Sequence, residues 1–198
     1  NEHFKSSTNR SPTESTDGKP GEEGRFKIEV ALLADVGLVG LPNAGKSSLL
    51  NSFTNATSAV GAYPFTTLEP HLGSLYEFLL ADIPGLIAGA AKGKGLGHKF
   101  LRHVSRTTML LHLVSLEHGE PRQVYEEIRR ELAEYGRDMV TKEEWIVLTK
   151  SDLSIPEIYE PLKTEFEANN QRVFVISTET GEGVKELRDE LVAHLRAR

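Results

Sequence analysis

The chain has 198 residues, of which 38% are hydrophobic and 26% are charged, a composition typical of one globular domain with a tail. It contains no cysteine, which excludes disulfides and thiolate metal sites and is common in cytoplasmic proteins. A net charge of −6 argues against a protein that coats nucleic acid, although it leaves room for a local basic contact. The longest apolar stretch, around residues 109–114, is too short to span a membrane. We therefore expect a cytoplasmic protein without a membrane span.

The order of strand-like and helix-like segments predicts an α/β fold. Residues 1–25 are rich in Ser, Thr, Asn, Gly, Pro and charge, so we expect a linker or the remnant of another domain there. The expected strands are 27–32 leading into 35–39, then 72–76, 78–82, 109–114, 145–149 and 173–177. The expected helices are 46–54, 97–106, 121–135, 155–169 and 183–197. Short apolar strands that alternate with amphipathic helices predict a mostly parallel six-stranded sheet with helices on both faces. Ligands of such sheets bind at the carboxyl ends of the strands.

A phosphate-binding loop is the clearest motif of the chain. Residues 40–48 read GLPNAGKSS and match the pattern G-x-x-x-x-G-K-[ST] between a strand-like and a helix-like run. Glycines let successive backbone N–H groups face a polyphosphate, and the start of the following helix adds a favourable dipole. We expect Lys46 to reach the β- and γ-phosphates and Ser47 to offer its hydroxyl to Mg²⁺. The expected nucleotide-binding residues of this loop are Gly40, Pro42, Asn43, Ala44, Gly45, Lys46, Ser47 and Ser48.

A second motif supplies the expected metal and γ-phosphate contacts. The segment Asp82-Ile-Pro-Gly85 is a D-x-x-G sequence at the end of an expected strand, 36 residues after Lys46. By itself D-x-x-G is usually just a turn, but here it follows a phosphate loop in the expected order. Asp82 would hold Mg²⁺ and the Gly85 N–H would contact the γ-phosphate. The intervening loop 63–67 carries hydroxyls, of which Thr67 would complete the Mg²⁺ shell. The predicted metal ligands are therefore Ser47, Thr67 and Asp82, and the predicted catalytic residues are Lys46, Thr67, Gly85 and Asn43.

A third pair of motifs points to a guanine base. In the segment Thr149-Lys150-Ser151-Asp152, a carboxylate at Asp152 can accept hydrogen bonds from N1–H and the 2-amino group of guanine, which adenine does not offer. The aliphatic stem of Lys150 would lie over the base. Beside them we expect further contacts to the base from Leu153, Ser177 and Thr178. Each motif has an alternative reading as a helix cap or turn, but their order at strand ends favours a guanine-nucleotide site.

These residues resemble the Obg family of translation-associated GTPases. The matching strings are LLADVGLVGLPNAGKSSLLN, YPFTTLEP, ADIPGLIAGA and GKGLGHKFLRHVSR. The resemblance implies a Ras-like P-loop GTPase fold over 26–198 and the end of a glycine-rich N-terminal domain in 1–25. It further implies slow Mg²⁺-dependent hydrolysis of GTP to GDP by a monomeric switch in large ribosomal subunit assembly, with ribosomal RNA as a partner and guanine nucleotides, including alarmones, as ligands. The family usually has Asn at the place of Thr149, so we expect a weaker tie from that residue to the phosphate loop.

The source of catalysis is left open by the sequence. Ras-like enzymes orient the attacking water with a Gln after the D-x-x-G glycine, but this chain has Leu86 there. One alternative is K⁺ held by Asn43, which could equally be a turn residue. The other is a partner that contacts a basic stretch within 83–116, which could equally be a solvated helix face. Its basic residues are Lys92, Lys94, Lys99, Arg102 and Arg106. A nucleotide-gated ribosome- or RNA-binding module with negligible intrinsic hydrolysis is the alternative function. An ATP-using relative is disfavoured by Asp152.

The segment between Pro70 and Asp82 is short for the strands expected in it. Its sequence HLGSLYEFLLA scarcely accommodates two antiparallel strands and a turn. We therefore expect either a stunted hairpin or residues missing from this part of the chain.

Overall fold

The computed structural model describes residues 4–11, 13, 18–21, 23–25, 34–54, 59–60, 71–83, 107–117, 119–135, 140–169 and 171–198, with only the backbone of 59–60. The chain divides into two units, Asn1–Val30 and Ala31–Arg198. The described part of the first unit contains a turn in which the backbones of Ser6 and Asn9 exchange hydrogen bonds of 3.1 and 3.2 Å. None of the described helices is long and apolar enough to cross a membrane.

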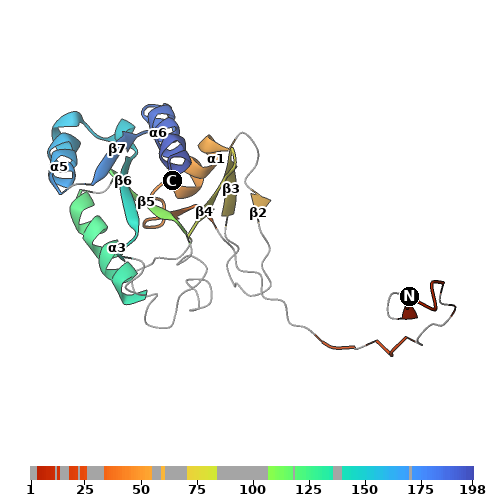
Figure 1. The fold of residues 1–198 in the computed structure, drawn as a ribbon. Coiled ribbons are helices and arrows are strands. Elements are labelled where there is room, and N and C mark those ends of the chain that lie inside the picture. The colour runs from red at the N-terminus through yellow and green to blue at the C-terminus, as the bar shows by residue number, and fades with distance from the viewer. Residues whose placement is uncertain are drawn as a thin grey trace. The chain divides into compact units, whose positions relative to one another are not determined.

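The second unit is built on one sheet with the strand order β2-β3-β4-β1-β5-β6-β7 (Figure 1). The strands are β1 (Val36–Val39), β2 (Ala59–Val60), β3 (His71–Leu75), β4 (Phe78–Asp82), β5 (Met109–Ser115), β6 (Glu143–Thr149) and β7 (Arg172–Ile176). The strands from β4 to β7 in that order are parallel, whereas β3 pairs antiparallel with both β4 and the edge strand β2. The predicted mostly parallel α/β sheet is confirmed. The two-residue strand β2 is a seventh strand that the sequence pattern did not predict, and the expected strand segment 27–32 lies outside the described residues.

Helices cover both faces of the sheet, as expected. The described α-helices are α1 (Lys46–Phe53), α3 (Pro121–Tyr135), α5 (Pro156–Ala168) and α6 (Val184–Arg196), and the expected helix 97–106 lies outside the described residues. Alternate residues of β5 separate the two layers: Leu111 and Leu113 belong to the core under α1 and α6, and Leu110 belongs to the core under α3. Because β5 is buried on both faces, its sequence MLLHLVS is apolar apart from the buried His112 and Ser115.

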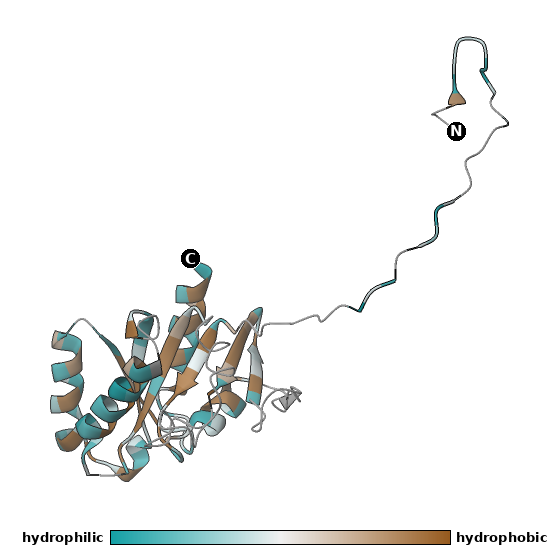
Figure 2. Cartoon of the chain, turned by 90° about the horizontal axis from the view of Figure 1, so that it is seen from below, coloured by the Kyte–Doolittle hydropathy of each residue, from teal (hydrophilic) through white to brown (hydrophobic). Residues whose placement is uncertain are grey.

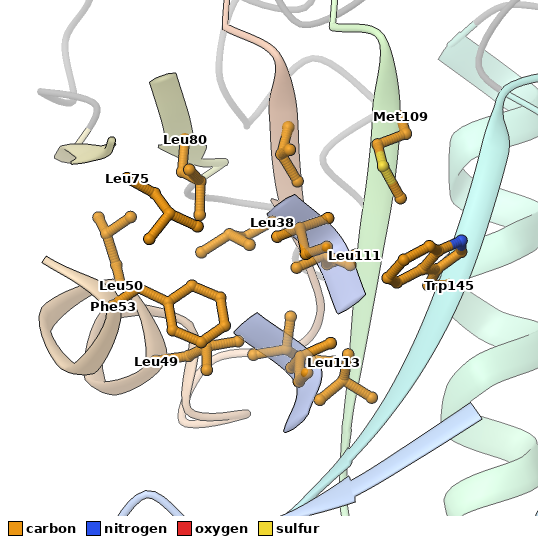
Figure 3. Packing of buried hydrophobic residues seen from close by; sticks show 14 of the residues in the cluster. Leu38, Leu49, Leu50, Phe53, Leu75, Leu80, Met109, Leu111, Leu113 and Trp145 are labelled. Carbon is orange, nitrogen blue, oxygen red and sulfur yellow. The ribbon is translucent and has the colours of Figure 1, made fainter. Parts of the chain in front are cut away.

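The larger core lies between the sheet and the helices α1 and α6. In Figure 3 the side chains of Leu49 and Phe53 from α1 lie below Leu38 of β1, and Trp145 of β6 closes the far side. Figure 2 shows the same pattern along the chain, with largely brown strands inside helices that alternate brown and teal. Helical spacing of Leu187, Leu191 and Leu195 puts these residues on one buried stripe of α6.

The hairpin β3–β4 fits into the short segment that precedes Asp82, so the expectation that two strands scarcely fit there was wrong. Leu75 pairs with Phe78, which leaves Tyr76 and Glu77 as a two-residue loop. Tyr76 takes a positive φ of 52°, which is uncommon for a bulky residue but typical of tight hairpin loops. Arg196 at the end of α6 contacts this tip: its guanidinium donates to Glu77 at 2.9 and 3.2 Å and lies 5.6 Å from the Tyr76 ring.

Two glycines in the loop between β7 and α6 give a test of backbone strain. Gly181 and Gly183 have φ angles of 83° and 68°, but only at Gly183 would an added Cβ collide, 2.2 Å from the Val175 carbonyl oxygen. Gly181→Ala is therefore expected to cost about 1–2 kcal/mol of unfolding free energy, from the left-handed backbone alone. Gly183→Ala should cost clearly more, because the loop must also move away from β7. Urea denaturation of both variants measures the difference, and equal losses would contradict the predicted collision.

Candidate nucleotide-binding site

The phosphate loop connects β1 to α1 through three unusual backbone conformations. Gly40, Asn43 and Gly45 have φ angles of 153°, 63° and 90°. At Gly40 a Cβ would lie 2.5 Å from the Leu113 carbonyl oxygen, so only glycine lets the loop leave the sheet this close to β5. Asn tolerates the left-handed conformation better than most residues, which explains Asn43 structurally without any ligand. The Ala44 N–H donates to the Leu41 carbonyl at 3.1 Å and closes the turn.

Lys46 lies inside this loop, not in solvent. It is buried, and its Nζ donates to the carbonyl oxygens of Gly40 and Leu41, both at 3.0 Å. Burial lowers the pKa of the Lys46 ammonium, while the Asp82 carboxylate acts in the opposite direction. An ammonium at the first turn of a helix is well placed to meet an anion. The negative charge of a bound polyphosphate would stabilise the charged form of Lys46, which burial disfavours.

Ser47 and Asp82 meet although they are far apart in the sequence. The Ser47 hydroxyl donates to Asp82 Oδ2 at 2.7 Å, which ties the start of α1 to the end of β4. The other oxygen, Asp82 Oδ1, is buried and has no hydrogen-bond partner among the described residues. The described residues contain no group of three or more His, Cys, Asp or Glu that could hold a metal. Mg²⁺, however, is commonly bound through one or two protein oxygens together with substrate phosphates and water, so this pair fits it.

Thr149 connects the expected base-binding segment to the phosphate loop. Its buried hydroxyl donates to the Ala44 carbonyl oxygen at 2.8 Å, across 105 residues of sequence. The same hydroxyl lies 3.5 Å from the Val114 carbonyl oxygen, so the shorter bond to Ala44 makes the connection to the phosphate loop.

The segment after Thr149 leaves the sheet and becomes exposed at Asp152 and Leu153, whereas Ser151 is buried. Lys150 takes a left-handed conformation with φ 60° and ψ 44°, and the short 3-10 helix Ser151–Leu153 follows. Asp152 is exposed and Leu153 has 59% of its surface exposed, so both are accessible to a base. The Lys150 ammonium forms an ion pair with the Glu117 carboxylate at the end of β5.

Ser177 organises the loop after β7. It is fully buried, its N–H donates to the Glu182 carbonyl at 3.0 Å, and its carbonyl accepts from the Gly181 N–H at 2.9 Å. Its hydroxyl also accepts from the Thr180 N–H at 3.2 Å. Since Thr149 pairs with Ile176 in the sheet, this loop begins beside the segment 149–153. Thr178, partly exposed, is the more accessible of the two predicted residues.

The structure thus gathers most predicted site residues at the carboxyl edge of the sheet. These residues lie at or just after the ends of parallel strands: the phosphate loop, Asp82, the segment 149–153 and Ser177 with Thr178. Thr67, Gly85 and Leu86 lie outside the described residues, as do Lys92, Lys94, Lys99, Arg102 and Arg106. Glu117, the ion-pair partner of Lys150, is not among the predicted residues. It belongs to no motif, and only its position just after an expected strand could have pointed to it.

The hydroxyl of Thr149 is expected to stabilise the loop geometry. Thr149→Val keeps the shape but leaves the Ala44 carbonyl without this buried donor, which should cost about 1–3 kcal/mol of unfolding free energy. Thr149→Ser, which keeps the hydroxyl, is the matched control and should lose less. Chemical denaturation of both variants without nucleotide checks this, and a valine variant as stable as wild type would show that the bond contributes nothing.

Comparisons with known proteins agree with this geometry. A family model described as 50S ribosome-binding GTPase matches residues 35–150. A GTPase Obg from Desulfatibacillum aliphaticivorans is 47% identical over 205 residues, covering 99% of this chain and 60% of that protein. The GTPase Obg of Sorangium cellulosum (strain So ce56) is 44% identical over 212 residues, covering 100% and 61%. The chain therefore spans about three fifths of the length of these relatives.

Solved structures share the fold at lower sequence identity. The G domain of the FeoB iron transporter from T. maritima superposes with a TM-score of 0.54 at 23% identity, covering 82% of this chain and 98% of that one. A GDP-bound mutant of NFeoB from S. thermophilus gives 0.57 at 20%, covering 78% and 58%. These likenesses show the fold alone, and the Ras-like P-loop architecture expected from the sequence is confirmed. With its family-model match and its resemblance to GTPase Obg proteins, the chain belongs to the 50S ribosome-binding GTPase family.

Proposed function

We propose that this chain is a G domain, residues 26–198, that binds guanine nucleotides and hydrolyses GTP to GDP as a slow molecular switch. The observation that carries the proposal is the meeting of Lys46, the Ser47–Asp82 pair and the exposed Asp152 at one edge of the sheet. Phosphate, metal and base would thus each find a partner within one site. Residues 1–25 would be the end of a glycine-rich domain.

The buried cation and the loop backbone would bind the phosphates. Lys46 would exchange its two loop carbonyl partners for β- and γ-phosphate oxygens, while N–H groups of the loop face the same anion. Ser47 and Asp82, with Thr67, would hold Mg²⁺, which when bound neutralises charge on the β- and γ-phosphates. The Gly85 N–H would contact the γ-phosphate. The remaining loop residues, Pro42, Ala44 and Ser48, would line the phosphate site.

The attacking water must be activated by a group other than the glutamine that Ras-like enzymes use. Leu86 is apolar and cannot orient water, so hydrolysis would depend on K⁺ near Asn43 or on a partner. The description of the family and the basic stretch within 83–116 support the large ribosomal subunit, contacted through its RNA, as that partner. The protein would act in the cytoplasm as a monomer. A nucleotide-gated module with negligible intrinsic hydrolysis is the second candidate, and Leu86 is the residue that favours it.

Guanine recognition is tested at Asp152. Asp152→Asn removes a carboxylate that would accept two N–H donors of the base, so GDP affinity should fall about 100-fold or more. Calorimetric titration with GDP and ADP measures this, with Asp189→Asn on the exposed face of α6 as the control. Unchanged GDP affinity in the Asp152 variant, or equal binding of ADP by wild type, would reject the guanine site.

The cation hypothesis is tested by single-turnover GTP hydrolysis in potassium and in sodium buffer. If Asn43 coordinates K⁺, potassium should accelerate hydrolysis, and Asn43→Gly should abolish the acceleration. Glycine is the suitable replacement because it keeps the left-handed backbone at φ 63° that alanine would strain. Potassium stimulation that survives in the glycine variant would remove Asn43 from this role, whereas negligible rates in both buffers would favour the nucleotide-gated module.

A further inference from the structure

We propose that Glu117 is a positioning residue for base recognition: it holds the Lys150 side chain and keeps the Lys150 ammonium away from the Asp152 carboxylate. The inference rests on the proposed guanine site and adds to it a residue that belongs to none of the nucleotide-binding motifs. Glu117 comes from the end of β5, whereas Lys150 and Asp152 follow β6, the neighbouring strand.

The backbone around Glu117 is fixed to the base-binding segment. The Leu116 N–H donates to the Thr149 carbonyl at 2.9 Å, and the Glu117 N–H approaches the Ser115 hydroxyl at 3.3 Å. These bonds continue the β5–β6 pairing one residue beyond the sheet. The Glu117 carboxylate is therefore carried by the same rigid edge as Lys150, and it meets the ammonium in an ion pair.

The ion pair decides which of two carboxylates Lys150 meets. Asp152 lies only two residues further along, yet its carboxylate makes no hydrogen bond or ion pair with any described residue. Guanine recognition requires this carboxylate to accept two N–H groups, and an ammonium placed on it would compete for the same oxygens. By binding Lys150 from the β5 side, Glu117 leaves Asp152 available and keeps the lysine stem along the path on which the base would stack.

The expected energetic effect is moderate because the pair is partly exposed. The side chains of Lys150 and Glu117 have 27% and 41% of their surface exposed, so water and salt screen the attraction. Such a pair contributes little to folding, but it fixes the position of a side chain in the site. Removing it should therefore change nucleotide affinity without changing the stability of the nucleotide-free domain.

The test compares Glu117→Gln with Glu120→Gln, a matched control in the same loop, by calorimetric titration with GDP and with inosine diphosphate. Inosine lacks the 2-amino group, so it makes one of the two bonds to Asp152. Glu117→Gln should weaken GDP binding about fivefold, in line with the loss of one partly exposed ion pair. Its preference for GDP over inosine diphosphate should also fall, and the difference from wild type should shrink in 1 M NaCl. Glu120→Gln should behave as wild type.

Two results would overturn the inference while wild type still binds GDP tightly. One is wild-type affinity for both nucleotides in Glu117→Gln. The other is an equal loss for both nucleotides that persists in 1 M NaCl, which would indicate a general structural change. If wild type itself bound no GDP, the proposed function would fail first, so the two failures are distinguishable.

Discussion

The hydrogen bond from the Thr149 hydroxyl to the Ala44 carbonyl is the contact on which the organisation of the site depends. It joins the end of β6 to the loop after β1, across the intervening strand β5. Because both ends are buried, the bond is shielded from water and the loop cannot shift without breaking it. The phosphate loop and the segment 149–153 are therefore joined, with a spacing set by the sheet.

Near this hydrogen bond lie two buried charged side chains, and their removal from water destabilises the folded state. Lys46 is buried with two carbonyl partners, and Asp82 is buried with one oxygen that has no partner among the described residues. Such groups are expensive when they lack a counter-charge. A polyphosphate with a divalent cation would supply the missing charge and oxygen ligands. The burial of these two charged groups destabilises the fold, and the apolar core must offset that cost.

A second set of buried polar side chains, around His112, lies where α3 packs on the sheet. His112 on β5 is fully buried and its Nδ1 lies 2.7 Å from Glu144 Oε1 on β6. Arg129 of α3 approaches the other oxygen of Glu144 at 3.0 Å. The Tyr125 ring lies 4.8 Å from the His112 ring, and burial is the main cause that raises the pKa of the Tyr125 hydroxyl. These contacts fix α3 against the two strands whose ends carry Glu117 and Thr149.

The sequence by itself determined the elements and the chemistry of the phosphate loop, because both depend on local patterns. Apolar runs and helical spacing predicted six strands and the four described helices, and GLPNAGKSS predicted the loop through the conformational needs of its glycines. Tertiary structure decided what depends on distant residues. The tight Tyr76–Glu77 turn meets Arg196 from the far end of the chain. The strand β2 has only two residues, too few to show a sequence pattern. Pairing of β5 with β6 brings Glu117 next to Lys150. This contact could not be predicted from the sequence, because the two residues are far apart along the chain.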